Sequence, residues 1–146
     1  MFRHIEKQID FKPVTEEQYE QLTIPLKKMG VTILRGTDEV EQHLEQFDAL
    51  GATIGTDIVM FRRKVSASTI LEETYHIIQN RNGLNDDKAA DLRYILNEID
   101  VKRHLLRVAK RYDLPRSEVE TTKRQLTELE ALLRDYLRRE EAPDDV

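Results

Sequence analysis

Two different periods of hydrophobic and polar residues divide this chain, and the change between them falls near Lys64. Before it, short runs of β-branched or alternating apolar residues predict strands at 31–35, 52–54 and 58–63, the last two separated by a Gly-Thr-Asp turn. Residues 37–50 instead carry apolar side chains at helical spacing. The first part of the chain is therefore predicted to mix strands and helices.

A further helix is expected before the first strand, between Thr15 and Met29. Pro25 lies inside its apolar pattern, and because a proline removes a backbone donor from a helix, a break or kink is expected there. Gly30 is expected to end this helix, and Gly51 to end the next one.

From residue 65 to about residue 140 the pattern is helical. The first helix of this part carries N-cap candidates from Ser66 to Thr69, and Thr69 with Glu72 three residues later fits a capping box. This helix, which carries the sequence ILEETYHIIQ, should end near Asn82.

Two long helices are predicted after it. The first can be capped by Asp86 or Asp87 and runs to about Tyr112, and Pro115 breaks it. A second apolar stripe then continues toward the C-terminus, so the two helices are expected to pack as an antiparallel hairpin.

Together these elements predict a single α+β domain over residues 1–146. A small N-terminal β-sheet with helices would occupy residues 15–64, and a motif helix with a long C-terminal helical hairpin would occupy residues 65–140. The charged start, residues 1–14, is expected to be mobile, and the acidic end, residues 141–146, is expected to be frayed.

The composition narrows the classes of function. The chain has 23 basic and 28 acidic residues without a basic patch, so no nucleic-acid partner is expected. It has no cysteine, which leaves His, Asp and Glu as ligands for a bound transition metal. No apolar run reaches membrane length and the charged start is not a signal peptide. We therefore expect no membrane partner, and a place in the cytoplasm or export as part of a longer protein.

The candidate chemistry lies on the motif helix, where Glu72, Glu73 and His76 form the pattern E-E-x-x-H. At about 100° per residue these side chains share one face with Gln79, opposite the apolar face. Residues 72 and 76 are one turn apart, so both can bind one metal ion, and Glu73 between them can act as a general base. The alternative is that this face is the solvated side of an ordinary amphipathic helix.

The order of a strand, IVMFRRKV, a short Ser/Thr turn and this helix resembles the zincin-like metallopeptidase fold, whose metal-binding helix reads HExxH. The stretch 51–83 also resembles a small metallopeptidase-like domain found toward the C-termini of bacterial polymorphic toxins and phage-associated proteins. The similarity extends through the two long helices to about residue 137.

This resemblance implies a divalent metal centre. Glu73 matches the general base, His76 the second ligand, and Gln79 a polar residue often found one turn on. Glu72 departs from the family pattern because it stands where HExxH has its first histidine. A carboxylate can bind zinc in place of imidazole, but its charge lowers the Lewis acidity of the ion. With a third carboxylate the site would lean toward harder ions, so manganese and magnesium are alternatives to zinc, although less favoured ones.

A third ligand is expected from the next helix. Glu98, 22 residues after His76, fits the position at which glutamate-type zincins place theirs, and Asp91 and Asp100 are the alternatives. Glu98 also lies four residues before Lys102, so it can instead be a surface residue in a helical ion pair.

Two functions are compatible with the sequence. The first is a metal-dependent hydrolase, a zincin-like peptidase or toxin-type domain, acting on a protein or peptide substrate with Glu73 as general base. The second is a noncatalytic protein-interaction domain that keeps a zincin-like frame and binds a partner, such as an immunity protein, through its helical hairpin.

Overall fold

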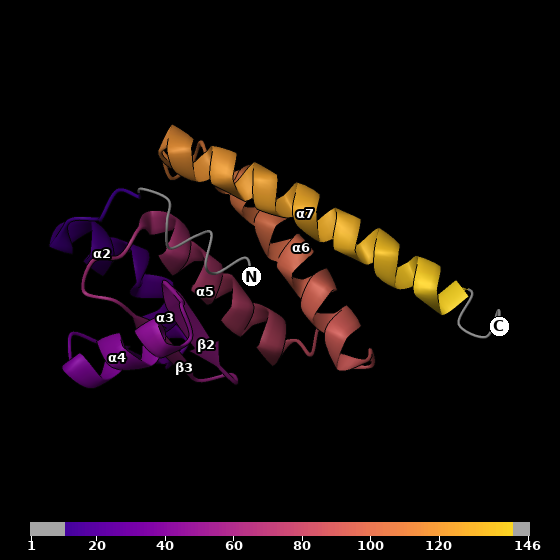
Figure 1. The fold of residues 1–146 in the computed structure, drawn as a ribbon. Coiled ribbons are helices and arrows are strands. Elements are labelled where there is room, and N and C mark those ends of the chain that lie inside the picture. Colours follow the sequence, from indigo (N-terminus) through magenta and orange to yellow (C-terminus); the bar gives the residue numbers. More distant parts are fainter. Residues whose placement is uncertain (1–10, 142–146) are drawn as a thin grey trace.

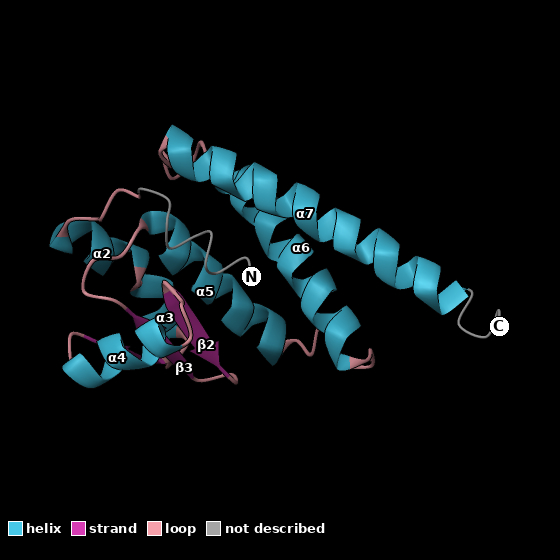
Figure 2. Cartoon of the chain, viewed as in Figure 1, coloured by secondary structure: helices cyan, strands magenta, loops and turns pink. Residues whose placement is uncertain are grey.

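A computed structural model describes residues 11–141, and these residues form an α+β fold with one three-stranded sheet and six helices (Figures 1 and 2). The helices are α2 (Glu16–Leu22), α3 (Ile24–Lys28), α4 (Asp38–Gln46), α5 (Ala67–Arg81), α6 (Ala90–Val108) and α7 (Arg116–Glu141). The strands are β1 (Thr32–Arg35), β2 (Gly51–Ile54) and β3 (Ile58–Phe61). The predicted α+β class is confirmed, with the sheet confined to the first part of the chain.

The sheet has the order β1-β3-β2, in which β1 runs parallel and β2 antiparallel to the central strand. Side chains of β3 alternate between its two faces. Val59 and Phe61 enter a core shared with α2, α3 and α5, whereas Met60 packs against the core beneath α4. The helix α5 therefore lies against the sheet, with β2 as the neighbouring edge strand.

Several helix ends differ from the prediction. The capping box at Thr69 and Glu72 is wrong: Ser66 is the N-cap, because its extended backbone lets its side-chain oxygen accept from the N–H of Thr69. The helix α5 therefore starts at Ala67, and Glu72 is free of any capping role.

The break expected near Pro25 is confirmed. The helix α2 ends at Leu22, and Pro25 occupies the first turn of α3, where its missing N–H costs no hydrogen bond. Gly51 does not end α4, which stops at Gln46 before the left-handed residue Asp48, with φ of 53°. The helix α6 starts at Ala90 rather than after a cap at Asp86 or Asp87.

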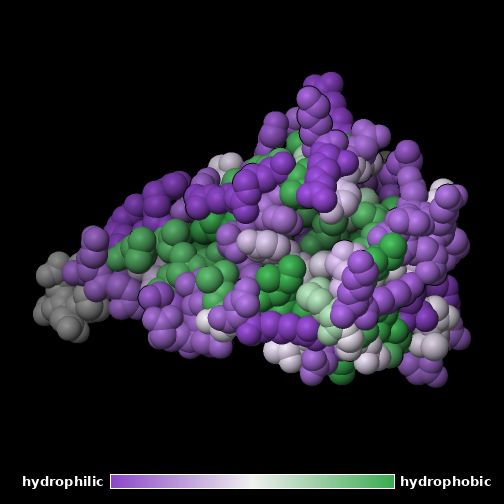
Figure 3. Space-filling view, turned by 180° about the vertical axis from the view of Figure 1, so that it is seen from behind, coloured by the Kyte–Doolittle hydropathy of each residue, from purple (hydrophilic) through white to green (hydrophobic). Residues whose placement is uncertain are grey.

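The hairpin of α6 and α7 covers the side of α5 that faces away from the sheet (Figure 1). Val101 and Leu105 of α6 pack against Leu71 of α5, while Ile95 and Ile99 on another side of α6 pack against α7. Seen from behind, apolar side chains gather along this hairpin (Figure 3). Within residues 11–141, no helix is both long enough and apolar enough to cross a membrane.

Residues 1–10 and 142–146 lie outside the described part of the chain, and most of the predicted mobile start and frayed tail falls on them. Residues 11–14 of the predicted mobile start are described. Among them, the N–H of Val14 donates to the carbonyl of Val65 at 2.9 Å.

Gly51 lets the edge strand approach the motif helix closely. A Cβ atom at this position would come within 2.8 Å of the Thr69 methyl group and 3.3 Å of Glu73 Cγ. Real Cβ atoms essentially never approach another heavy atom to 2.8 Å, so any other residue would push β2 away from α5.

Replacing Gly51 by Ala should therefore lower the free energy of unfolding by about 1–3 kcal/mol, as overpacking of a tight contact does. Urea denaturation measures this change. Adding Thr69→Ser removes the methyl group that the new Cβ would meet, and Ser keeps the hydroxyl that bonds Ser66, so the double variant should recover part of the loss. Equal loss in the single and double variants would contradict the close approach.

Candidate metal centre

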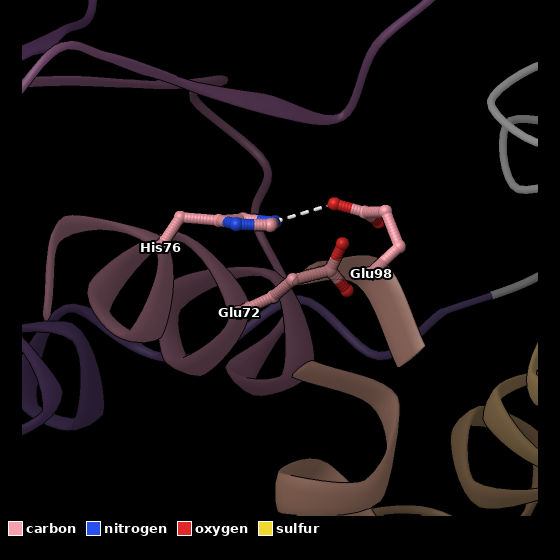
Figure 4. Close-up of side chains that lie close together, drawn as sticks. All are labelled: Glu72, His76 and Glu98. Carbon is pink, nitrogen blue, oxygen red and sulfur yellow. Dashed lines mark ion pairs between the residues drawn. The ribbon is translucent and has the colours of Figure 1, made fainter. Parts of the chain in front are cut away.

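Three side chains of ligand chemistry converge from two helices (Figure 4). Glu72 and His76 project from α5 one turn apart, and Glu98 projects toward them from α6. One ligand atom from each lies within 4.8 Å of the others, and among the described residues this is the group with the spacing of a metal site. His76 Nε2 and Glu98 Oε2 are 2.9 Å apart, and each of the three side chains is 17% exposed.

Gln79 fixes the orientation of the His76 ring. Its amide nitrogen donates to the backbone carbonyl of Asn97 at 2.9 Å and to the Asp100 carboxylate at 3.1 Å. Both of these groups are acceptors, so the amide oxygen must face His76, where it lies 3.0 Å from Nδ1. An oxygen at that place accepts a hydrogen bond from Nδ1–H, which leaves Nε2 as the ring nitrogen directed at Glu98 and available to a metal ion.

The residues fit a divalent cation. Two carboxylates and one imidazole with a fixed tautomer make a three-ligand set, as catalytic zinc sites use, and they leave coordination positions open. Burial would lower the pKa of His76, but the hydrogen bond with Glu98 and the nearby carboxylates raise it to about 10.

Glu73 is buried beside this centre. Its side chain is 7% exposed, and the hydroxyl of Thr53 on β2 donates to Oε1 at 3.0 Å. Burial, together with the carboxylates of Glu72 and Glu98, raises the pKa of Glu73 to about 7, although His76 and the Thr53 hydrogen bond oppose the shift. A carboxyl group that titrates near neutral pH can both accept and return a proton.

Lys102 closes the centre on the α6 side. This lysine is 3% exposed, and its ammonium lies 3.0 Å from Glu72 Oε2. It follows Glu98 by one helical turn, so both side chains leave the same face of α6. The positive charge therefore lies beside Glu72, one of the three candidate ligands.

The centre opens into a cleft of about 380 Å³. Residues of β2, α5, α6 and α7 form its walls, and Gly51, Ala52 and Thr53 of the edge strand line one side. At the α7 side, Ser68 hydrogen-bonds the buried carboxylate of Glu118, which joins the start of α7 to the start of α5. The cleft is thus bounded by elements far apart in sequence.

The structure brings together the four residues expected to carry chemistry and Gln79, but not every alternative. Asp91 is exposed and lies outside the cleft, and Asp100 contacts Gln79 rather than joining the ligand group. Glu98 is largely covered and pairs with His76. On the polar face of α5, Glu73 and Gln79 are buried, whereas Asn80 is exposed.

Sequence reasoning missed Lys102 and Thr53 as members of the site. The four-residue spacing predicts an ion pair between Lys102 and Glu98 on one helix. The contact of Lys102 with Glu72 instead joins two helices, α6 and α5. Thr53 lies in a short strand with no distinguishing pattern, so no sequence signal indicated it.

Comparisons with known proteins found no match, whether to a family model, a curated protein or a solved structure. The resemblance to zincin-like domains therefore stays a prediction from the sequence.

The raised pKa of Glu73 has a consequence for the metal-free protein. A folded-state pKa of about 7 against a model value of 4.5 means that the folded chain holds the Glu73 proton longer than the unfolded chain does. Its contribution to stability is present below the unfolded pKa and is lost as pH rises through about 7. Glu73→Gln should then match the parent near pH 4.5 and exceed its unfolding free energy by about 2–3 kcal/mol at pH 8.

Chemical denaturation in chelator across this pH range measures the difference. Glu120→Gln, which neutralises an exposed carboxylate on α7, is the matched control and should show no such pH dependence. A constant difference between Glu73→Gln and the parent would contradict the shift.

The Gln79 contacts predict a second effect. Gln79→Leu removes both the acceptor for His76 Nδ1 and the donors to α6, so zinc affinity should fall about 10- to 100-fold, as loss of a ligand's hydrogen-bond partner does elsewhere. Calorimetric titration with zinc measures it. Asn80→Ala removes only a side-chain hydrogen bond to the carbonyl of Gly55 in the 55–57 turn, so it should bind zinc like the parent. Equal affinities for all three proteins would refute the role of Gln79.

Proposed function

We propose that this chain is a divalent-metal-dependent hydrolase that cleaves amide bonds in polypeptides. The observation that carries the proposal is the convergence of Glu72, His76 and Glu98 on one point of a cleft. Zinc suits this mixed carboxylate and imidazole set, with manganese or magnesium as less favoured ions. The buried neighbour Glu73, with a pKa raised to about 7, completes the arrangement.

A divalent cation held by these three ligands would polarise a substrate carbonyl and make a nearby water more acidic. The chain itself supplies the proton transfers. Glu73 lines the same cleft as the ligands, and its carboxylate accepts a proton from a water molecule there and passes it to the leaving amine. The hydroxyl of Thr53 bonds Oε1 and so orients the carboxylate for this transfer.

The edge strand β2 supports a polypeptide substrate. Within the described residues β2 pairs only with β3, and residues of β2 line the cleft beside the ligands. An extended chain can add to such an edge through main-chain hydrogen bonds, which bind a peptide without demanding one sequence. The strand lies beside the motif helix because Gly51 allows the close approach.

Three proteins test this function together: the parent, Glu73→Gln and His76→Ala. Each is loaded with zinc, manganese or magnesium, its bound metal is measured, and a mixed library of quenched fluorescent peptides serves as substrate. Glu73→Gln should bind metal nearly as the parent does and lose hydrolysis by about 100-fold or more, since a general base contributes a factor of about 10²–10⁴. His76→Ala should lose both properties.

Two results would contradict the proposal. A parent protein that binds none of the three ions would exclude the metal centre, and the noncatalytic interaction domain would then be the better account. A parent that binds metal while Glu73→Gln keeps full hydrolysis would refute the assigned base. Circular dichroism of each variant confirms that the fold is retained.

A further inference from the structure

Lys102 raises a question that the metal centre alone does not answer. Burying an ammonium group is costly unless an opposite charge and hydrogen bonds compensate it. Lys102 is 3% exposed, and it reaches the Glu72 carboxylate at 3.0 Å across the gap between α6 and α5. The fold thus holds a positive charge 3.0 Å from Glu72, one of the three side chains suited to a cation.

The charges of the centre show what this lysine can do. In an HExxH site the first ligand is a neutral imidazole, but here it is Glu72, which brings an additional negative charge. Lys102 bonds Oε2 of that carboxylate. A carboxylate has two oxygens, so Oε1 can still bind an ion. The pair of Glu72 and Lys102 together carries no net charge, and in this respect it is equivalent to a neutral imidazole ligand.

We propose that Lys102 is a positioning residue that makes Glu72 equivalent in charge to a histidine ligand and thereby sets the metal selectivity of the centre. The inference rests on the proposed function, since it concerns the same ion. Lys102 acts through Glu72 by withdrawing negative charge from its carboxylate. A less charged donor set favours the softer zinc, whereas uncompensated carboxylates favour harder ions such as manganese.

Removing the lysine charge should therefore change selectivity in a definite direction. In Lys102→Met the centre keeps two fully charged carboxylates and loses a repulsive cation. Manganese affinity should rise by about tenfold or more, because a unit positive charge bonded to a ligand carboxylate repels a divalent ion strongly even at an effective dielectric constant of about 20. Zinc affinity should rise less, so the ratio of zinc to manganese affinity falls.

The experiment measures zinc and manganese affinities by competition with a chromophoric chelator for the parent, Lys102→Met and Lys102→Gln. Lys102→Gln keeps a hydrogen-bond donor without the charge, so it serves if Lys102→Met does not fold. Lys123→Met is the matched control, because it removes one positive charge from an exposed ion pair on α7. It should leave the ratio unchanged.

A rescue adds a readout that packing alone would not move. Glu72→His removes the carboxylate that compensates the buried Lys102 ammonium, so the uncompensated positive charge should repel the ion and weaken zinc binding. The double variant Glu72→His with Lys102→Met restores an ordinary HExxH set and should recover zinc affinity. A double variant that binds zinc no better than Glu72→His alone would overturn the proposal.

The possible failures are distinct. If the parent binds neither ion, the proposed function fails and this inference falls with it. If the parent binds zinc but both Lys102 variants keep its zinc to manganese ratio, the inference alone is overturned and the metal centre stands. A lowered ratio in both Lys102 variants, unchanged in Lys123→Met, supports the role assigned to Lys102.

Discussion

Mutual repulsion among buried carboxylates is the constraint on which the rest of this structure depends. Glu72, Glu73 and Glu98 surround His76, and carboxylates at such spacing cannot all be ionised without compensation. Three features supply it: the ion pair between His76 and Glu98, the burial that raises the pKa of Glu73 to about 7, and the Lys102 ammonium beside Glu72. Concentrating several carboxylates whose charges need compensation lowers stability, so a helix face with only a structural role is not expected to do so. This cost supports the proposed function.

The packing of α6 against α5 turns this constraint into a site. The motif helix provides two of the proposed ligands and the proposed base, while α6 provides Glu98, Lys102 and the Asn97 carbonyl that holds Gln79. Apolar contacts of Leu71 with Val101 and Leu105 hold the two helices together on one side of the polar groups. The ligand geometry is therefore a product of tertiary packing, whereas the helix itself only sets the spacing of residues 72 and 76.

The parts of this arrangement that depend on local periodicity could be predicted from the sequence. The α+β class, the motif helix, the long hairpin and the choice of Glu98 follow from apolar spacing or from the family resemblance. The helix starts were less predictable, because Ser66 and Thr69 are both good N-caps and backbone conformation decides between them. The contacts of Thr53 and Lys102 could not be predicted, since each joins elements whose relative placement no local pattern encodes.

Placing the candidate ligands on two helices also links occupancy of the centre to the packing of α6 against α5. Residues 82–89 join α5 to α6, and any separation of these two helices about this segment would move Glu98 away from Glu72 and His76. An ion bound by all three would add its binding free energy to the contacts between the two helices. Availability of the ion would then set how often α6 separates from α5, and with it the exposure of the apolar surfaces that α6 covers.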